Sequence, residues 1–508
     1  MPPRQGIVTR KGFVQQAVLP EPEGSLTNVF YLAKGRKYGA WISENFLFTA
    51  SPITDRLTTG SNHNWENGAM VRVSTTGTLP TGLAAATTYF VVQKNSGTFK
   101  LSATRGGSAI DITGAGTGFH TVTRYTGYTT TDFIEQPVYV IESILRDELG
   151  LTSARINTAS FDELGNSTDG RRNGWKHARS ITERISPFSL IGEIAEESAL
   201  FFLYDHVNKA RVVAIDHYAP TTVIGKSHIA VENNRPVIRT RKTHVRHIQN
   251  RFRINYRFNH GNGGFDKELF VNESDNNLSD NTRNDKSPVN TYEGLCSHSQ
   301  TMYNYVREWV FESSGIRDEA TAELFIKTMA DWLAIRKWEV HATLLYGATT
   351  LAIEHGDQVL FDADVDILPI SARNTLVDNV AAVPGSAGVL DDDTYYYVVT
   401  AVDKYGETKL SAEVNATTTA GAGMGSVAIS WDELEGANKY RVYGRTTGSQ
   451  SLYKETASTS LVDDGSAWTA GTPPTVAPAF FVTRIRDGGP RNGGKLVVEF
   501  VLCPVVFF

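Results

Sequence analysis

The run from Thr394 to Glu407, TYYYVVTAVDKYGE, restricts the folds open to this chain more than any other segment. Aromatic and β-branched residues alternate with polar ones, and the alternation stops at the turn sequence DKYG. Because successive side chains of a strand point to opposite faces, this period predicts a strand that runs into a hairpin. The segment VAISWDELEGANKYRVYGRTTG supplies two more expected strands, with Trp431, Tyr440 and Val442 facing inward.

These strands together resemble a fibronectin-type-III-like module, an adhesive β-sandwich that carries no chemistry of its own. The module occupies residues 374–478 and ends in the linker TAGTPPTVAPA. A second insert is expected at residues 58–125, where charges are sparse and Gly, Thr and Ser are abundant. Its strands are predicted at Met70–Ser74, Thr88–Val92 and Thr98–Ser102, separated by glycine-rich turns.

The remaining segments form the host domain into which both modules are inserted. We expect an N-terminal β-domain at residues 1–57, central domains of mixed helices and strands at residues 126–373, and C-terminal strands at residues 479–508 that return to the host. Helical spacing predicts one helix over Ile141–Leu149 and another after Pro187, with Glu193, Glu196 and Glu197 on the outer face of the second. A hairpin is expected around Asn208. The alternating run Val237–Asn259 predicts one long half-buried strand. The fold class is therefore mainly β with a few helices (α+β), in several domains.

Length and composition set broad limits. A chain of 508 residues predicts roughly three to four domains. The formal net charge of −6 argues against a general nucleic-acid binder, and a mean hydropathy of −0.25 is typical of a globular protein. Cys296 and Cys503 are the only cysteines, so neither a disulfide framework nor a cysteine metal site is expected.

The two ends of the sequence suggest neither export nor membrane insertion. The start, MPPRQGIVTRKGFVQQ, has no apolar core of the kind found in signal peptides. The end, KLVVEFVLCPVVFF, is apolar but shorter than the roughly 20 residues that a spanning helix needs. We expect it to form a buried strand or an interface segment, and we expect no membrane-spanning segment.

The order of host segments resembles the tail-tip or baseplate hub proteins of long-tailed bacteriophages. VIESILRDELGL and SFDELGN are followed by the helix ISPFSLIGEIAEESALFFLYD, the strand NRFRINYRFN, and a helix that leads to IEHGDQVLF. The first insert, with TTGTLPTGLAAATTYFVV, resembles a small β-module of phage tail and fibre proteins. The chain has no recognisable lytic domain, so cell-wall digestion is not expected.

The resemblance implies a structural virion protein assembled in the bacterial cytoplasm. It would form a homotrimeric hub of stacked β-domains that closes the tail tube and anchors fibres or a spike. Its partners would be copies of itself, distal tail or tube proteins, and fibres or spike, with DNA passing only through the channel. No cofactor is implied. The alternative is a receptor-binding adhesin in which the sandwich contacts a host surface glycan.

Candidate chemistry is sparse, and we predict no enzyme activity. His244 and His247 would point to opposite faces of a strand, so a shared metal is not expected. The carboxylates on the outer faces of the helices fit a solvated surface better than the catalytic pair of a glycosidase. A carbohydrate-degrading enzyme is the second alternative to the hub. Asp391–Asp393 fit a turn better than a calcium site.

Two groups of residues are candidate contact sites. One is a basic stretch that would bind a polyanion or a neighbouring subunit, or else pair with carboxylates of its own chain. Its arginines are Arg239, Arg241, Arg246, Arg251, Arg253 and Arg257. The other consists of Trp65, Tyr405 and Trp468, which would contact a glycan or protein partner if exposed, or else cover their own β-cores.

Overall fold

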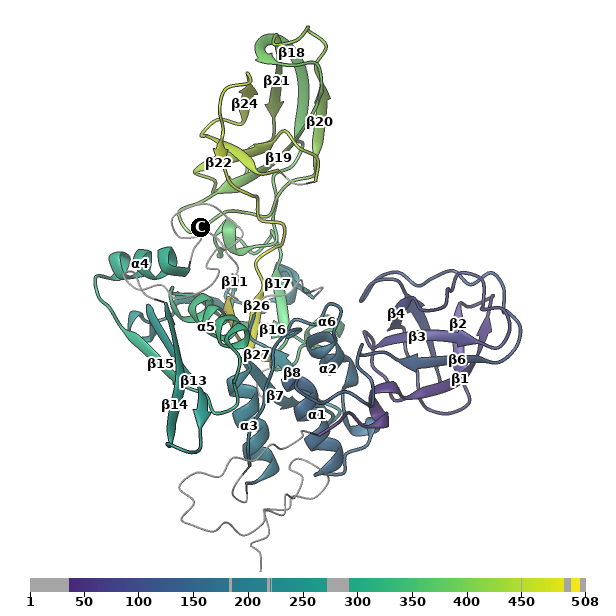
Figure 1. Cartoon of the computed structure of the whole chain (residues 1–508). Coiled ribbons are helices and arrows are strands. Elements are labelled where there is room, and N and C mark those ends of the chain that lie inside the picture. Colours follow the sequence, from purple (N-terminus) through teal and green to yellow (C-terminus); the bar gives the residue numbers. More distant parts are fainter. Residues whose placement is uncertain are drawn as a thin grey trace, which may run out of the picture. The chain divides into compact units, whose positions relative to one another are not determined.

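Figure 1 shows the computed structural model, which describes residues 36–181, 185–216, 220, 222–271, 292–448, 450–487 and 495–502. The predicted fold class, mainly β with a few helices, is confirmed by the strands and helices of these residues. Residues 1–35 of the predicted N-terminal domain lie outside the described residues, as do Cys503 and the segment that follows it.

The chain divides into two compact units. Unit 1 comprises Met1–Ala214, Ile254–Leu269 and Phe311–Phe325. Unit 2 comprises Ile215–Arg253, Phe270–Val310 and Ile326–Phe508. The first predicted insert therefore belongs to unit 1, and the predicted sandwich belongs to unit 2.

Six antiparallel strands of unit 1 form a closed barrel in the order β1-β2-β5-β4-β3-β6 (Figure 1). Their bounds are β1 Asn45–Ser51, β2 Arg56–Thr59, β3 Met70–Thr75, β4 Thr88–Val92, β5 Thr98–Ser102 and β6 His120–Arg124. The pairing of β1 with β6, which sets Phe48 opposite His120, closes the barrel. Closure removes free sheet edges and leaves one interior for apolar side chains.

The three strands predicted for the first insert are confirmed as β3, β4 and β5. The barrel nevertheless begins at Asn45, ahead of the boundary at Thr58 that composition suggests, because residues 45–59 supply two of its six strands. Its interior holds Trp65, Phe99 and Val122, all fully buried.

The helical part of unit 1 has its own core. Its elements are α1 Pro137–Asp147, α2 Thr158–Gly165, α3 Pro187–Glu197, β7 Leu200–Tyr204 and β8 Ala210–Ala214. Proline stands at the start of α1, and the Gln136 side chain accepts a hydrogen bond of 2.6 Å from the Val138 amide, so the helix has a defined beginning. Asn208, with φ of 64°, turns the β7–β8 hairpin as predicted.

Unit 2 is built on a six-stranded sheet with the order β12-β16-β27-β26-β17-β9. The bounds are β9 Val223–Ile224, β12 Ile238–Lys242, β16 Trp338–Leu345, β17 Gln358–Phe361, β26 Phe480–Asp487 and β27 Lys495–Leu502. One face is apolar, and the ring of Phe361 packs edge-on against those of Phe480 and Phe500 at 4.9 and 5.2 Å. Because β27 lies between two other strands, the prediction that the apolar C-terminal run begins as a buried strand is confirmed.

The prediction of one long strand over Val237–Asn259 is wrong. The run contains two strands, β12 and β13 Arg251–Asn259, separated by a 3-10 turn at Val245–His247. Alternate burial is confirmed within β13, where Phe252, Ile254 and Tyr256 are buried and their neighbours are partly exposed.

Residues 381–470 form a β-sandwich with one core between two sheets, β18-β21-β24 and β20-β19-β22-β23-β25. The bounds are β18 Ala381–Leu390, β19 Thr394–Val402, β20 Val414–Thr417, β21 Gly425–Ser430, β22 Lys439–Gly444, β23 Leu452–Thr456, β24 Ser460–Asp463 and β25 Thr469–Ala470. The predicted strand at Thr394 is β19, and Trp431, Tyr440 and Val442 are buried as expected.

The other described elements complete the two units. They are β10 Val231–Glu232, β11 Arg235–Pro236, β14 Gly264–Val271, β15 Glu308–Glu312, α4 Tyr292–Tyr303, α5 Glu319–Leu333 and α6 Ala348–Leu351. Strands β13, β14 and β15 make a three-stranded sheet in the order β14-β13-β15. Among the helices of the described segments, none has the length and apolar character needed to cross a membrane.

Candidate functional site

The barrel leaves and re-enters its host between two segments that pair with each other. Lys37 and Phe133 form an antiparallel bridge. The Tyr38 amide donates to the Asp132 carbonyl at 3.2 Å, and the Ile134 amide donates to the Arg36 carbonyl at 2.8 Å. The host chain is thus closed at the base of the barrel, as expected for a module inserted into a loop.

A buried arginine connects the last barrel strand to two host helices. Arg124, the last residue of β6, is 1% exposed. Its guanidinium donates to both oxygens of Glu142 on α1, at 2.9 and 3.0 Å, and to both oxygens of Asp162 on α2, at 3.0 and 2.6 Å. It also donates to the Trp41 carbonyl at 3.3 Å. Two bidentate pairs fix both position and orientation, which a single contact would not.

We call Arg124, Glu142 and Asp162 the Arg124 node. Their buried charges, with that of the nearby Arg146, compensate one another in the protein interior. Burial alone would raise the pKa of Glu142, but Arg124 and Arg146 outweigh it and hold that pKa below its ordinary value. Burial raises the pKa of Asp162, and this effect outweighs the opposing effects of Arg124 and Arg105. Although burial opposes it, the two carboxylates raise the pKa of Arg124 well above its ordinary value, so the guanidinium stays charged.

The sandwich is inserted in a similar way into the unit 2 sheet. Strand β17 precedes it and β26 follows it, and the two pair antiparallel, with Val359 opposite Phe480 and Gln358 opposite Phe481. Asp362 and Asn374 also form a bridge at the exit. Host strands on either side of the sandwich are therefore hydrogen-bonded neighbours, so the sheet is continuous without it.

Side chains of the first sandwich turn hold the module against its host. Asp403 accepts hydrogen bonds from the Ser371 hydroxyl at 2.8 Å and from the Ser371 amide at 3.1 Å. The Tyr405 ring packs edge-on against Trp338 of β16, with centroids 5.1 Å apart. The ammonium of Lys242 lies 5.2 Å from the Trp338 ring and 4.6 Å from the Tyr405 ring. Burial, with the nearby charges of Arg336 and Lys404, lowers the pKa of Lys242, although Asp403 opposes the shift.

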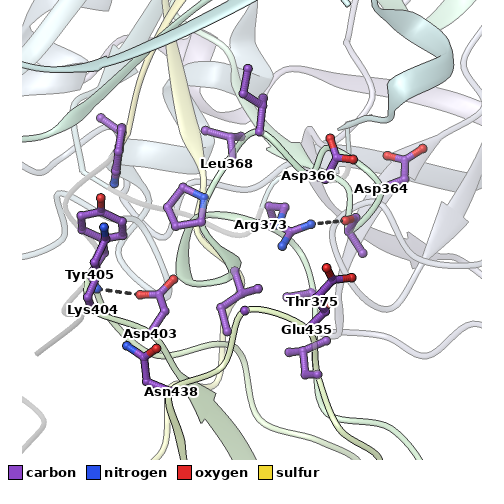
Figure 2. A pocket seen from close by; sticks show the side chains of 17 residues that line it. Asp364, Asp366, Leu368, Arg373, Thr375, Asp403, Lys404, Tyr405, Glu435 and Asn438 are labelled. Carbon is purple, nitrogen blue, oxygen red and sulfur yellow. Dashed lines mark hydrogen bonds between the residues drawn. The ribbon is translucent and has the colours of Figure 1, made fainter.

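An open cleft of about 840 Å³ lies beside this turn, lined by host and sandwich residues (Figure 2). Its acidic side chains are Asp364, Asp366, Asp403 and Glu435, and its basic ones are Arg373 and Lys404. Arg373 donates to the Ala363 carbonyl at 2.6 Å, and burial lowers its pKa against the opposing effect of the nearby carboxylates. The mixture of charges fits polar recognition, and the residues show no nucleophile with an activating base.

The structure separates the six predicted arginines into two groups. Arg241 pairs with Glu339 across β12 and β16, and Arg253 pairs with Glu308 at 2.9 Å. Arg239, Arg246 and Arg257 are exposed, and Arg251 is partly exposed. Among the described residues, carboxylates of the same chain therefore neutralise only some of these arginines.

None of the three predicted contact aromatics projects freely. Trp65 is fully buried in the barrel core, which corrects the expectation that it lies on the surface. Tyr405 is half-buried against Trp338, and Trp468 is half-buried against Tyr397, with ring centroids 6.1 Å apart. Trp65 and Trp468 pack on the cores of their own modules, as in the alternative interpretation, whereas Tyr405 packs against Trp338 of the host sheet.

His244 and His247 lie at the 3-10 turn and not on a strand. The prediction that they point to opposite faces of a strand is therefore wrong. Their ring centroids are 6.4 Å apart. Across the described ranges no group of three or more His, Cys, Asp or Glu side chains is arranged to hold a metal ion. The exposed Asp391–Asp393 lie at the turn before β19, where Asp392 accepts a hydrogen bond of 3.0 Å from the Gly421 amide.

The expectation that Glu197 is solvated is wrong. Its side chain is 8% exposed, and its Oε2 lies 2.7 Å from Nε2 of His177. Its Oε1 accepts from the amides of Ser314 and Gly315 at 3.0 and 3.2 Å. The signal was present in the spacing, because Glu197 follows Ile194 by three positions and so continues the apolar stripe of α3.

Comparison with known proteins gives low similarity. The chain matches no protein-family model, and no curated protein matches it. Among solved structures it is similar to the 43 kDa tail protein of prophage MuSo2 from Shewanella oneidensis, at 9% identity and a TM-score of 0.25, over 64% of this chain and 90% of that one.

Two further structures are similar to the same extent. A chain of the virion of a native gene transfer agent particle shares 10% identity, with a TM-score of 0.30, over 61% of this chain and 72% of that one. A tail protein from Neisseria meningitidis MC58 shares 8% identity, with a TM-score of 0.25, over 77% and 94%. Scores of this size do not define a common fold, so the function must be argued from the residues of this chain.

Proposed function

We propose that the protein is a structural component of a bacteriophage tail, a trimeric tail-tip or baseplate hub that carries two mounted β-modules. The observation that carries this proposal is that each module is inserted between paired host segments, at the Lys37–Phe133 bridge and at the β17–β26 pair. A host that closes on itself beneath each insert can keep its own contacts while presenting the modules.

The order of the host elements supports the same proposal. The helices α1, α2 and α3, the β7–β8 hairpin, β13, α5 and then β16 and β17 follow one another as the hub resemblance requires. The buried Arg124 node and the contacts of Tyr405 attach the modules firmly, which suits a protein whose role is mechanical. Fibres, a spike or distal tail proteins would be its partners, and the virion would be its location.

Deletion of the sandwich tests the proposal. Residues 375–477 would be replaced by a short Gly-Ser linker across the paired ends of β17 and β26. We expect the purified full chain and the deletion variant to have the same trimeric mass by light scattering and to show the same ring by negative-stain microscopy. A monomeric full chain, or antibody labelling at fibre tips instead of the tail end, would contradict the hub.

Binding of a glycan on the surface of the bacterial host cell is the second candidate function, and the cleft beside Tyr405 favours it. The cleft combines two aromatic side chains, Trp338 and Tyr405, with several carboxylates, as in many polar ligand sites. Calorimetry with host polysaccharide should give heat with the full chain and none with the sandwich deletion. Assembly of the deletion variant into tails that no longer adsorb to cells would support an adhesin role for the sandwich, whereas unchanged adsorption would exclude it.

A further inference from the structure

The turn that follows β12 is held by two arginines from elsewhere in unit 2. Arg336 donates to the Thr243 carbonyl at 2.6 Å and to the Lys242 carbonyl at 3.3 Å. Arg307 donates to the Arg246 carbonyl. These hydrogen bonds hold the two guanidinium groups beside the turn, which itself contains the cations Lys242 and Arg246. We name Lys242, Arg246, Arg307 and Arg336 the basic turn.

The cations of the basic turn are not ion-paired with any carboxylate of the residues that the structure describes. Within the described part of the chain, none of the four lies within ion-pair distance of an Asp or Glu side chain, in contrast to Arg241 and Arg253. Uncompensated cations held close together repel one another, and this repulsion is relieved when an anion binds. Sequence alone does not reveal this group, because Arg307 and Arg336 come from distant segments.

Two members of the basic turn are available to a partner. Lys242 is partly buried between aromatic rings, and the Arg336 guanidinium is occupied by backbone carbonyls. Arg246 and Arg307 are exposed.

Two histidines hold Arg246 in place. The Arg246 amide donates to Nδ1 of His244 at 3.0 Å, and its Nε donates to Nε2 of His247 at 3.3 Å. Among the described residues, no hydrogen-bond acceptor engages the two terminal nitrogens of this guanidinium. An arginine fixed in this way can receive a carboxylate with two parallel hydrogen bonds.

We propose that the basic turn binds carboxylate side chains of an acidic protein partner, with Arg246 and Arg307 as the contact residues. This inference rests on the proposed function, since the partner would be a neighbouring protein of the same tail. It narrows the predicted basic stretch to a small site and adds two residues that the sequence prediction lacked.

Two observations favour a protein partner over nucleic acid. Glu339 pairs with Arg241, the chain neighbour of Lys242, and Glu308 directly follows Arg307, so a continuous phosphate backbone would meet carboxylates while a discrete acidic side chain would not. The nearby rings of Trp338 and Tyr405 already contact each other and Lys242, which leaves them poorly placed for base stacking.

Fluorescence anisotropy on the isolated full chain tests the site. The probes are a fluorescein-labelled oligoglutamate peptide and a labelled DNA duplex of equal charge. We expect the peptide to bind with an affinity that falls as salt rises, and Arg246→Glu/Arg307→Glu to weaken it by about tenfold or more. The neutral variant Arg246→Gln/Arg307→Gln should weaken it less, and circular dichroism should show both variants folded.

The matched control is Arg155→Glu/Arg317→Glu, which makes the same change of charge at two exposed arginines of unit 1. It should leave peptide affinity within about twofold of the original, because a bulk-charge effect alone is screened by salt. Equal weakening in both double variants, or tighter binding of the duplex than of the peptide, would overturn the proposal. Because the measurement uses the isolated chain, a failure here is distinct from failure of the hub, which is read from the mass and the ring.

Discussion

The guanidinium of Arg124 lies 2.9 and 3.0 Å from the two carboxylate oxygens of Glu142, and neither side chain is exposed to solvent. Replacing one partner of such a pair leaves an uncompensated charge in the interior. We therefore expect Arg124→Met to lower the free energy of unfolding by about 3–5 kcal/mol. Urea denaturation followed by circular dichroism, together with limited proteolysis of the barrel, measures the loss.

The triple variant Arg124→Met/Glu142→Gln/Asp162→Asn is the control for this prediction. It removes the buried charges of Glu142 and Asp162 together with the arginine that pairs with them, so it should recover part of the lost stability. If the triple variant were no more stable than Arg124→Met, shape rather than charge would explain the effect.

Glu197 predicts a pH dependence of stability. Burial alone would raise its pKa, but His177 and the Gly315 amide outweigh burial and lower the pKa from its ordinary 4.5. A lowered folded pKa stabilises the fold above pH 4.5, and that contribution is lost as the pH falls through the folded value. Glu197→Gln should therefore be less stable at pH 7 and should lose less stability than the original chain between pH 5 and 3, as unfolding at a series of pH values would show. Parallel curves for the two proteins would refute this role.

Gly315 occupies a position where a larger residue cannot fit. A Cβ atom there would overlap the ring of His177 and the carboxylate of Glu197. Gly315→Ala should destabilise unit 1 by about 1–3 kcal/mol, measured by thermal unfolding. Gly192→Ala is the control, since nothing lies within 4 Å of its added Cβ. His177→Ala should make the second alanine easier to accommodate, so an additive double variant would argue against a clash with that ring.

Tyr405 predicts how firmly the sandwich is held. Removal of its ring deprives Lys242 and Trp338 of a contact, so Tyr405→Ala should speed protease cleavage in residues 362–374 while the sandwich itself stays folded. Tyr396→Ala, at a half-buried position on β19, is the comparison. Equal cleavage rates for Tyr405→Ala and the original chain would mean that the Ser371–Asp403 contact suffices.

Sequence patterns predicted the elements whose burial is set locally. Strand β19 and its turn, the alternation of β13 and the start of α3 all depend on neighbouring residues, and the structure confirms them. The break between β12 and β13 depends instead on distant partners. Tyr305 donates to the Val245 carbonyl at 2.6 Å, and the Arg307 amide donates to Asn250 at 2.8 Å, so the intervening backbone bonds outside the sheets.

The candidate sites were harder to predict for the same reason. Trp65 stands in the polar sequence HNWENG, which gives no sign that the barrel encloses it. Glu197 meets a loop more than a hundred positions away, at Ser314 and Gly315. Arg246 was predicted as part of a basic stretch, but the arginines that complete the basic turn are set by tertiary contacts.

The pairing of β17 with β26 also determines how the sandwich would respond to tension. The chain enters the module after Phe361 and returns at Phe480, so both connections leave from the same end of one antiparallel pair. Tension on the sandwich would load the hydrogen bonds between β17 and β26 one after another, beginning at the end where the sandwich is attached, and not all at once. The Ser371–Asp403 and Trp338–Tyr405 contacts would bear the load first. They would therefore break before the hydrogen bonds of the host sheet.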